Sequence, residues 1–311
     1  TSYRMVAINL RPLGMDELLQ SLNSQYGDIL ELWFGSNRAV VLCHPKYMVK
    51  IHQTSTKSKY IKRFQNINNP DGKEYGIVDS GVFNNNDIHG SWKFNRMVFS
   101  NALMRPKLDR DALQWTIELV EEMESYWKRA GIIIDDNDMN KALIEDKEII
   151  NLPDWMRRFT YDMIYRIAIG TKGDALNSYT NKLCGLNTYE TESNSIIKST
   201  QTYAEGIMYF RLFSKFVRNY FPYIRGIIRS NKNIGERSED GDDIKNSFVM
   251  FGGGLRMCPG RKLAMIELKC LVTMIYRKYD VELVDMNVPL KTKSTFLTSC
   301  EELLFRLKLR K

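Results

Sequence analysis

Histidine and cysteine are scarce in this chain, which holds three histidines and five cysteines among 311 residues. No two cysteines stand in a CxxC pair and the histidines lack the spacing of a zinc protease, so neither a structural zinc site nor a disulfide scaffold is expected. An odd number of cysteines at such low density fits a reducing compartment, which favours an intracellular protein.

Long hydrophobic runs are also missing. No apolar segment reaches the roughly 18 residues that a membrane-spanning helix needs, and the first residues lack the apolar core of a signal peptide. Residue 1 is threonine and not an initiator methionine, so we expect upstream sequence. A membrane anchor in that upstream sequence and a peripheral membrane contact therefore both stay open.

Acidic residues are the minority charge: 37 Asp and Glu stand against 45 Lys and Arg, for a net charge of +8. A basic balance suits nucleic acid, an anionic membrane or an acidic protein partner, although a solvated surface without a dedicated partner explains it more simply. No RNP-like, helix-turn-helix or zinc-finger pattern accompanies the charge, so no nucleic-acid partner is expected.

The remaining composition is that of a folded globular chain, with 43% hydrophobic and 11% aromatic residues. Apolar periodicity and the positions of proline and glycine predict a mainly α fold with a small β component. A stretch rich in Asn, Gly and Asp predicts a long loop over residues 64–90. The expected helices cover 15–22, 45–54, 92–103, 110–130, 154–170 and 261–276, with further helical pattern over 190–230, and the expected strands cover 29–34, 39–42, 281–284 and 303–309.

The segment FGGGLRMCPG, residues 251–260, has the properties of a loop that holds a thiolate against a metal. Gly254 and Gly260 permit positive φ angles and a close approach of the backbone. A helix expected from residue 261 points partial positive charge at the sulfur of Cys258 and favours the thiolate. Phe251 can cover the sulfur, and Arg256 has the guanidinium fork that binds carboxylates. A glycine-rich turn with an incidental cysteine is the alternative.

This segment resembles the haem-ligand signature of the cytochrome P450 family, in which Phe, Gly, Arg, Cys and Gly stand at fixed spacing. All five match, at Phe251, Gly254, Arg256, Cys258 and Gly260. The resemblance implies that Cys258 is the metal ligand, an axial thiolate on the iron of haem b. It also implies that Arg256 pairs with a haem propionate while the other three residues shape and cover the loop.

A second match lies far upstream, at HGSWKFNR, residues 89–96. It resembles the family's helix beside the haem, in which Trp and Arg stand four residues apart and so share one helix face. The resemblance implies that Trp92 and Arg96 contact a haem propionate. By spacing alone, a packing tryptophan followed by a surface arginine remains the alternative.

The similarity to the family covers most of residues 10–230 and 248–311. We expect a single P450-like domain over residues 1–311. Its N-terminal portion, 1–235, holds a β-rich first segment and helices. An acidic junction, 236–247, follows, and the C-terminal portion, 248–311, holds the cysteine loop, the next helix and the last strands.

Two family features are missing. The family's long distal helix carries an acid–alcohol pair that assists oxygen activation, and only about twenty polar residues stand where it should lie, too few for such a helix. The Glu-x-x-Arg pair, which anchors the haem loop in the family, occurs nowhere in the chain. We therefore expect a truncated cytochrome P450-like fold without a central block, and we identify no catalytic residue. Monooxygenation and haem retention should both be weakened.

Two functions follow from the resemblance. The first is a haem-binding monooxygenase that oxidises a small apolar organic substrate with O2 and electrons from an NADPH-dependent flavin reductase, at the endoplasmic-reticulum membrane as in eukaryotic relatives. The second is a catalytically impaired fragment, a splice or gene-model product with residual haem or protein binding. Basic side chains near the cysteine could dock an acidic reductase surface; they are Arg256, Arg261, Lys262 and Lys269.

Overall fold

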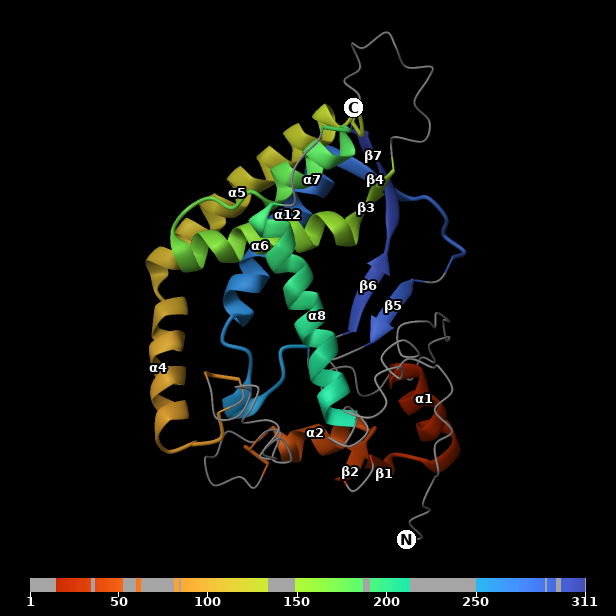
Figure 1. The fold of residues 1–311 in the computed structure, drawn as a ribbon. Coiled ribbons are helices and arrows are strands. Elements are labelled where there is room, and N and C mark those ends of the chain that lie inside the picture. Colours follow the sequence, from red (N-terminus) through yellow and green to blue (C-terminus); the bar gives the residue numbers. More distant parts are fainter. Residues whose placement is uncertain are drawn as a thin grey trace. The chain divides into compact units, whose positions relative to one another are not determined.

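The computed structural model of the chain divides by its contacts into two compact units (Figure 1). Unit 1 comprises Thr1–Arg105 with Gly206–Arg261, and unit 2 comprises Pro106–Glu205 with Lys262–Lys311. Each unit joins an early and a late stretch of the sequence. The expected single domain over 1–311 stays a prediction, and its acidic junction lies outside the described residues. The structure describes residues 15–34, 37–52, 60–62, 81–83, 85–133, 149–186, 191–212, 250–288, 290–294 and 298–310.

Unit 1 begins with a helix packed on a β-hairpin. Alternation along the first strand places Leu30 and Leu32 on one face, where they are buried together with Leu22 of the preceding helix. Pro45 stands in the first turn of the next helix, and Nδ1 of His44 accepts the Lys46 N–H at 3.2 Å. The elements are α1 (Met15–Tyr26), β1 (Ile29–Phe34), β2 (Asn37–Leu42), α2 (Pro45–Ile51), α4 (Ser91–Leu103) and a short 3-10 helix (Gly254–Arg256).

Unit 2 combines helices with two small antiparallel sheets. The three-stranded sheet has the order β3-β7-β4 and the two-stranded sheet pairs β5 with β6. The helices α8 and α12 each cross the boundary between the units. The elements are α5 (Pro106–Arg129), β3 (Ile150–Asn151), α6 (Leu152–Ile169), α7 (Ala175–Leu183), α8 (Glu192–Leu212), α12 (Arg261–Lys278), β4 (Tyr279–Leu283), β5 (Lys291–Ser294), β6 (Thr298–Glu302) and β7 (Leu304–Leu309).

The main core lies in unit 2 and is built around aromatic side chains. The ring of Trp155 meets Trp127 at 5.8 Å and Tyr179 at 5.2 Å between centroids, both edge to face. Phe305 of β7 and Leu271 of α12 are buried in the same cluster. The sheet and the helices of unit 2 therefore share one hydrophobic core.

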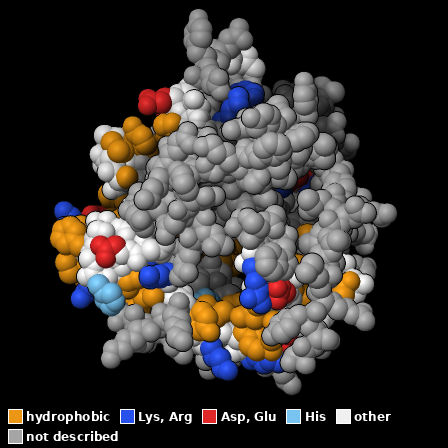
Figure 2. Space-filling model, turned by 60° about the horizontal axis from the view of Figure 1, so that its bottom comes forward, with side chains coloured by type: hydrophobic (Ala, Val, Ile, Leu, Met, Phe, Trp, Pro, Cys, Tyr) orange, Lys and Arg blue, Asp and Glu red, His pale blue; other side chains and the backbone are white. Residues whose placement is uncertain are grey.

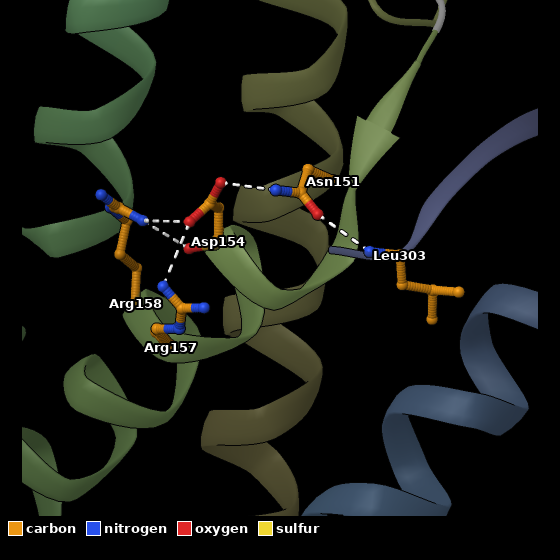
Figure 3. Close-up of polar contacts among 5 residues, drawn as sticks. All are labelled: Asn151, Asp154, Arg157, Arg158 and Leu303. Atoms are coloured by element: carbon orange, nitrogen blue, oxygen red, sulfur yellow. Dashed lines mark hydrogen bonds and ion pairs between the residues drawn. The ribbon is translucent and has the colours of Figure 1, made fainter. Parts of the chain in front are cut away.

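A polar network links the start of α6 to Asn151 of β3 and to Leu303, which directly precedes β7 (Figure 3). Oδ1 of Asn151 accepts the Leu303 N–H at 3.1 Å, while its Nδ2 donates to Oδ2 of Asp154 at 2.8 Å. Arg158 donates to the Asp154 carbonyl at 2.6 Å, and Arg157 lies 3.4 Å from the carboxylate. These bonds use polar groups that the junction of β3 and α6 would otherwise leave unpaired.

Asp162 is a buried carboxylate that joins two helices of unit 2. It is only 4% exposed and accepts the backbone N–H groups of Ala175 and Leu176 at 2.9 and 3.0 Å, at the start of α7. Gly173 leaves the space for this contact, because a Cβ there would stand 2.1 Å from Oδ1 of Asp162. Desolvation raises the pKa of Asp162, and the two N–H bonds oppose that rise.

Large hydrophobic side chains lie on the outward faces of several helices. Along α4 and its C-cap, Phe94, Met97, Val98 and Met104 are between 51% and 61% exposed, and Figure 2 shows hydrophobic side chains at the surface along this helix, at the left of the view. Outward apolar stripes usually meet another element. In unit 2 the residues of this kind include Ile164 and Ile169 of α6 and Leu268, Val272 and Tyr276 of α12.

The mainly α fold with a small β component is confirmed. The helix expected over 110–130 begins earlier than predicted, because α5 starts at Pro106, where the missing N–H costs no hydrogen bond. The short elements α7, β3, β5 and β6 were not predicted. Among the helices of the described residues, none has both the length and the apolar character needed to cross a bilayer.

Glu267 gives unit 2 a pH-dependent stability. It lies one turn before the buried Leu271 on α12, and desolvation raises the pKa of Glu267 to about 7. The pKa of Glu267 is higher in the folded state than in the unfolded state. The contribution of Glu267 to the unfolding free energy is therefore full below about pH 4.5 and is lost as the pH rises through about 7. Since Glu267 is half-buried, solvent screening limits the whole loss to about 2 kcal/mol.

Glu267→Gln should therefore flatten this part of the pH profile and stabilise the chain above neutral pH. Urea unfolding at acidic, neutral and mildly alkaline pH measures the change. Glu121→Gln, at an exposed carboxylate of α5, is the matched control and should leave the profile unchanged. If the unfolding free energy depended on pH equally in the wild type and in Glu267→Gln, the prediction would be contradicted.

Candidate functional site

The loop around Cys258 is closed by its own backbone. The Cys258 N–H donates to the Phe251 carbonyl at 2.8 Å, and the Met257 N–H donates to the Gly254 carbonyl at 3.2 Å. The Arg261 N–H reaches the Cys258 carbonyl at 3.4 Å, so α12 begins three residues after the cysteine. The Cys258 side chain is exposed and unpaired with another cysteine. A single accessible sulfur therefore sits in a fixed loop.

Two glycines of this loop have left-handed backbone conformations. Gly254 has a φ of 60°, as expected from the sequence, and Gly252 has a φ of 67°. The expectation of a positive φ at Gly260 is wrong, because the left-handed turns fall earlier in the loop. Gly260 instead lies beside the sulfur, where an added Cβ would stand 3.8 Å from Sγ of Cys258, an ordinary contact.

The structure brings the two predicted segments together within unit 1. The guanidinium carbon of Arg256 lies 4.3 Å from the centroid of the Trp92 ring. Trp92 is buried with Ile61 and Ile88, and Leu255 packs against this cluster. The segment with Trp92 and the cysteine loop are thus neighbours, although about 160 residues separate them in the sequence.

Arg96 contacts the loop next to the cysteine. One of its guanidinium nitrogens donates to the Met257 carbonyl, 161 residues away in the sequence. Burial lowers the pKa of Arg96, and the proximity of Cys258 opposes this shift. Arg96 therefore places a half-buried positive charge close to the sulfur, where a negative charge is stabilised.

The other donors predicted to meet a propionate are engaged within the chain. Trp92 Nε1 donates to the Val82 carbonyl at 2.9 Å, and the Arg256 guanidinium donates to several backbone carbonyls. The propionate contacts of Trp92 and Arg256 stay predictions, as does the covering of the sulfur by Phe251, whose side chain is half-buried. The carbonyls that accept these bonds could not be predicted from the sequence, because backbone acceptors leave no residue-type signal.

His52 was also missed, although it supports the loop. Its imidazole lies so close to Gly253 that an added Cβ would stand 2.7 Å from Cβ, Cγ and Nδ1 of His52. The requirement for glycine at position 253 therefore comes from close packing and not from a positive φ. A run of three glycines in the sequence signals a close approach but does not name the neighbour.

Gly253→Ala should displace the cysteine loop, because the atoms it would strike are close to the His52 backbone. We expect a loss of about 1–3 kcal/mol in unfolding free energy, the usual cost of overpacking. The double variant His52→Gly/Gly253→Ala removes all three atoms that the added Cβ would strike and, measured against His52→Gly alone, should recover most of that loss in urea unfolding. Gly185→Ala supplies a contrast, since nothing lies near its Cβ and only its positive φ resists the change. No recovery in the double variant would argue against the contact.

The donor set fits a haem better than a metal ion alone. Among the described residues, no group of three or more His, Cys, Asp or Glu side chains is placed to hold a metal ion. A haem brings its own nitrogen ligands and needs one axial ligand from the protein, which a lone exposed sulfur can supply. The cationic Arg96 beside it suits the negative charges of a thiolate and of haem carboxylates.

The fold is that of cytochromes P450 of known structure. The chain aligns with the crystal structure of a cytochrome P450, CYP102L1, at a TM-score of 0.57 and 14% identity, over 98% of this chain and 100% of that one. It aligns with the haem domain of cytochrome P450DA at a TM-score of 0.59 and 11% identity, over 99% and 97%. Moreover, the cytochrome P450 family model matches residues 5–234 and 235–309, and the chain belongs to this family.

Relatives match over short segments. Cytochrome P450 CYP13A7 of Caenorhabditis elegans is 39% identical over 79 residues, which are 24% of this chain and 15% of that protein. Monooxygenase sttB of Aspergillus terreus is 38% identical over 63 residues, 20% and 12% of the two chains. The rabbit (Oryctolagus cuniculus) 7-alpha-hydroxycholest-4-en-3-one 12-alpha-hydroxylase is 32% identical over 69 residues, 22% and 14%. The matches thus span at most 15% of these relatives' lengths.

Proposed function

We propose that this chain binds haem b with the Cys258 thiolate as axial ligand and functions as a monooxygenase of the cytochrome P450 type. When bound, a haem with a thiolate ligand supplies oxygen-activating chemistry. The observation that supports the proposal best is the convergence of two remote segments on one exposed sulfur. Arg96 holds the carbonyl next to Cys258, and Trp92 lies against Arg256.

The residues of the chain have distinct parts in this proposal. Cys258 holds the iron, and the α12 N-terminus favours its negative charge. Arg96 orients the haem through a carboxylate, with Phe251 limiting water at the sulfur. Gly254 gives the loop its turn, while Gly260 leaves room beside the sulfur.

The substrate and the partners belong to the same proposal. We infer a small apolar organic substrate, O2, and electrons from an NADPH-dependent flavin reductase. The rabbit relative is named as a hydroxylase of 7-alpha-hydroxycholest-4-en-3-one, which supports the substrate class. Arg261 and Lys269 are exposed and could meet an acidic reductase surface, whereas Lys262 pairs with Asp109. Peripheral contact with the endoplasmic-reticulum membrane completes the proposal.

An impaired fragment is the second candidate, and three observations favour it. The chain has no Glu-x-x-Arg pair. The family model matches in two pieces that meet at residues 234 and 235, close to the expected position of the missing central block. The helices α6 and α12 expose apolar side chains of the kind that pack against another helix. All three agree with a chain that lacks the distal acid–alcohol pair.

Titration of the purified chain with haem tests the proposal, followed by the carbon-monoxide difference spectrum of the reduced protein. A thiolate-type Soret band is expected, and a colourless protein would contradict haem binding. NADPH-dependent hydroxylation in the presence of a flavin reductase then separates the two candidates. Turnover far below the rates usual for the family indicates the impaired fragment, and turnover at those rates contradicts it.

A further inference from the structure

We propose that the outward face of α12 is a docking surface for a helix of another protein, a helix that is apolar along one side and acidic beside it. The surface consists of an apolar ridge, formed by Leu268, Val272 and Tyr276, and of the neighbouring cations Lys269 and Arg277. All five residues belong to unit 2, and the docking needs neither haem nor turnover. A failure of this proposal would therefore leave the proposed function untouched.

The apolar ridge is exposed although it adjoins the core. Leu268, Val272 and Tyr276 are 51%, 45% and 52% exposed, and they stand four residues apart, so they follow one another along one side of the helix. Leu271 and Ile275, each one residue earlier than a member of the ridge, are buried in the core of unit 2. The apolar surface of α12 is thus wider than its contact with the core, which is expected of a helix that meets a second partner.

The spacing of the ridge favours a helix as the occupant. Side chains four residues apart form the kind of ridge that fits the groove between the side-chain rows of a second helix. From Leu268 to Tyr276 the ridge spans about 12 Å, at 1.5 Å for each residue. This length corresponds to about two turns of a docked helix, which is enough for three or four apolar contacts.

The charges beside the ridge indicate the chemistry of the occupant. Lys269 and Arg277 are exposed one residue after Leu268 and Tyr276, and no ion pair among the described residues joins either cation to a carboxylate. The only acidic residue of α12 is Glu267, which is half-buried. Carboxylates along the occupant would therefore meet two available cations, whereas a second copy of α12 would bring like charges together.

A comparable apolar side chain on α6 lacks the basic border. Ile164 is 57% exposed, as much as any member of the ridge on α12. The residues one turn away from it along α6 are uncharged; they are Thr160, Tyr161, Ile167 and Ala168. Ile164 is therefore a matched control, because it has the hydrophobic exposure of the ridge without its charge.

The test titrates the full, haem-free chain against two fluorescently labelled synthetic peptides of about 20 residues. Both peptides have the amphipathic helical pattern and the same row of leucines, which glutamates border in one peptide and lysines in the other. Fluorescence anisotropy should show that the acidic peptide binds at least about tenfold more tightly, and that salt weakens its binding. The double variant Lys269→Glu/Arg277→Glu should reverse the preference between the peptides.

A second pair of variants tests the ridge itself. Val272→Glu interrupts the apolar row and should weaken binding of the acidic peptide about tenfold or more, whereas Ile164→Glu should bind it like the wild type. Urea unfolding shows whether each variant is folded, and Lys269→Glu/Arg277→Glu, at exposed positions, decides the matter if Val272→Glu is not. Equal affinities for the two peptides, no binding of either, or equal losses in Val272→Glu and Ile164→Glu would overturn the proposal. Self-association of the wild type in sedimentation, lost in Val272→Glu, would assign the ridge to a second copy of the chain and would also overturn it.

Discussion

Cys258→Ser is expected to abolish the thiolate-type Soret band of the haem-reconstituted, carbon-monoxide-treated chain. A serine hydroxyl stays protonated near neutral pH and is a poor substitute for a thiolate on iron. The loop should survive, because its closing bond comes from the backbone N–H of residue 258 to the Phe251 carbonyl. The spectral loss should therefore be complete while the unfolding free energy changes little.

Cys184→Ser is the matched control for this experiment. Cys184 is also exposed, but it caps the end of α7 in the other unit and its sulfur faces the Arg129 carbonyl at 3.7 Å. The same chemical change there should leave the spectrum intact. A thiolate-type band that persists in Cys258→Ser and disappears in Cys184→Ser would show that Cys184, and not Cys258, is the ligand.

Asp162→Ala is expected to cost about 2–4 kcal/mol in the unfolding free energy. It removes both acceptors of the Ala175 and Leu176 N–H groups in a buried site, and an unsatisfied buried donor costs about 1–3 kcal/mol. Asp162→Asn keeps one acceptor oxygen and should cost roughly half as much. Urea unfolding gives these values, with Glu121→Ala as the control at an exposed carboxylate.

The two Asp162 variants also separate hydrogen bonding from charge. Desolvation raises the pKa of Asp162, so its ionisation destabilises the folded state as the pH rises through the folded pKa. Asp162→Asn cannot ionise and should lose this dependence, and its deficit should therefore be smaller at neutral pH than at acidic pH. A deficit that grows toward neutral pH would show that the carboxylate charge itself stabilises the start of α7.

The sequence predicted the long helices well, because apolar periodicity is a local signal, and a second local signal singled out Cys258 as the candidate ligand, which stays a prediction. Apolar periodicity located α6 and α12, and the fixed spacing around Cys258 located the loop. Alternation with a turn signal located β1 and β2. The fold class follows from the predicted helices, since helices form most of the regular structure described.

The contacts that support the site were harder to predict, for a physical reason. Ile61, Val82 and Asn85 act through backbone carbonyls, which every residue type possesses, so no side chain marks them. His52 acts by occupying space beside Gly253, and shape complementarity between remote segments has no sequence period. Position 260 was misjudged because a glycine can be required by turn geometry or by proximity, and the sequence does not separate the two.

The long sequence separation between Arg256 and its hydrogen-bond acceptors has a consequence for biosynthesis. The loop joins partners up to 195 residues earlier in the chain. At typical rates of about 5–20 residues per second, the ribosome needs roughly 10–40 s to deliver Arg256 after Ile61. Throughout that interval Trp92, Ile61 and Ile88 lack the Leu255 that packs on them. The nascent chain thus exposes part of this apolar cluster to solvent until the cysteine loop has been made.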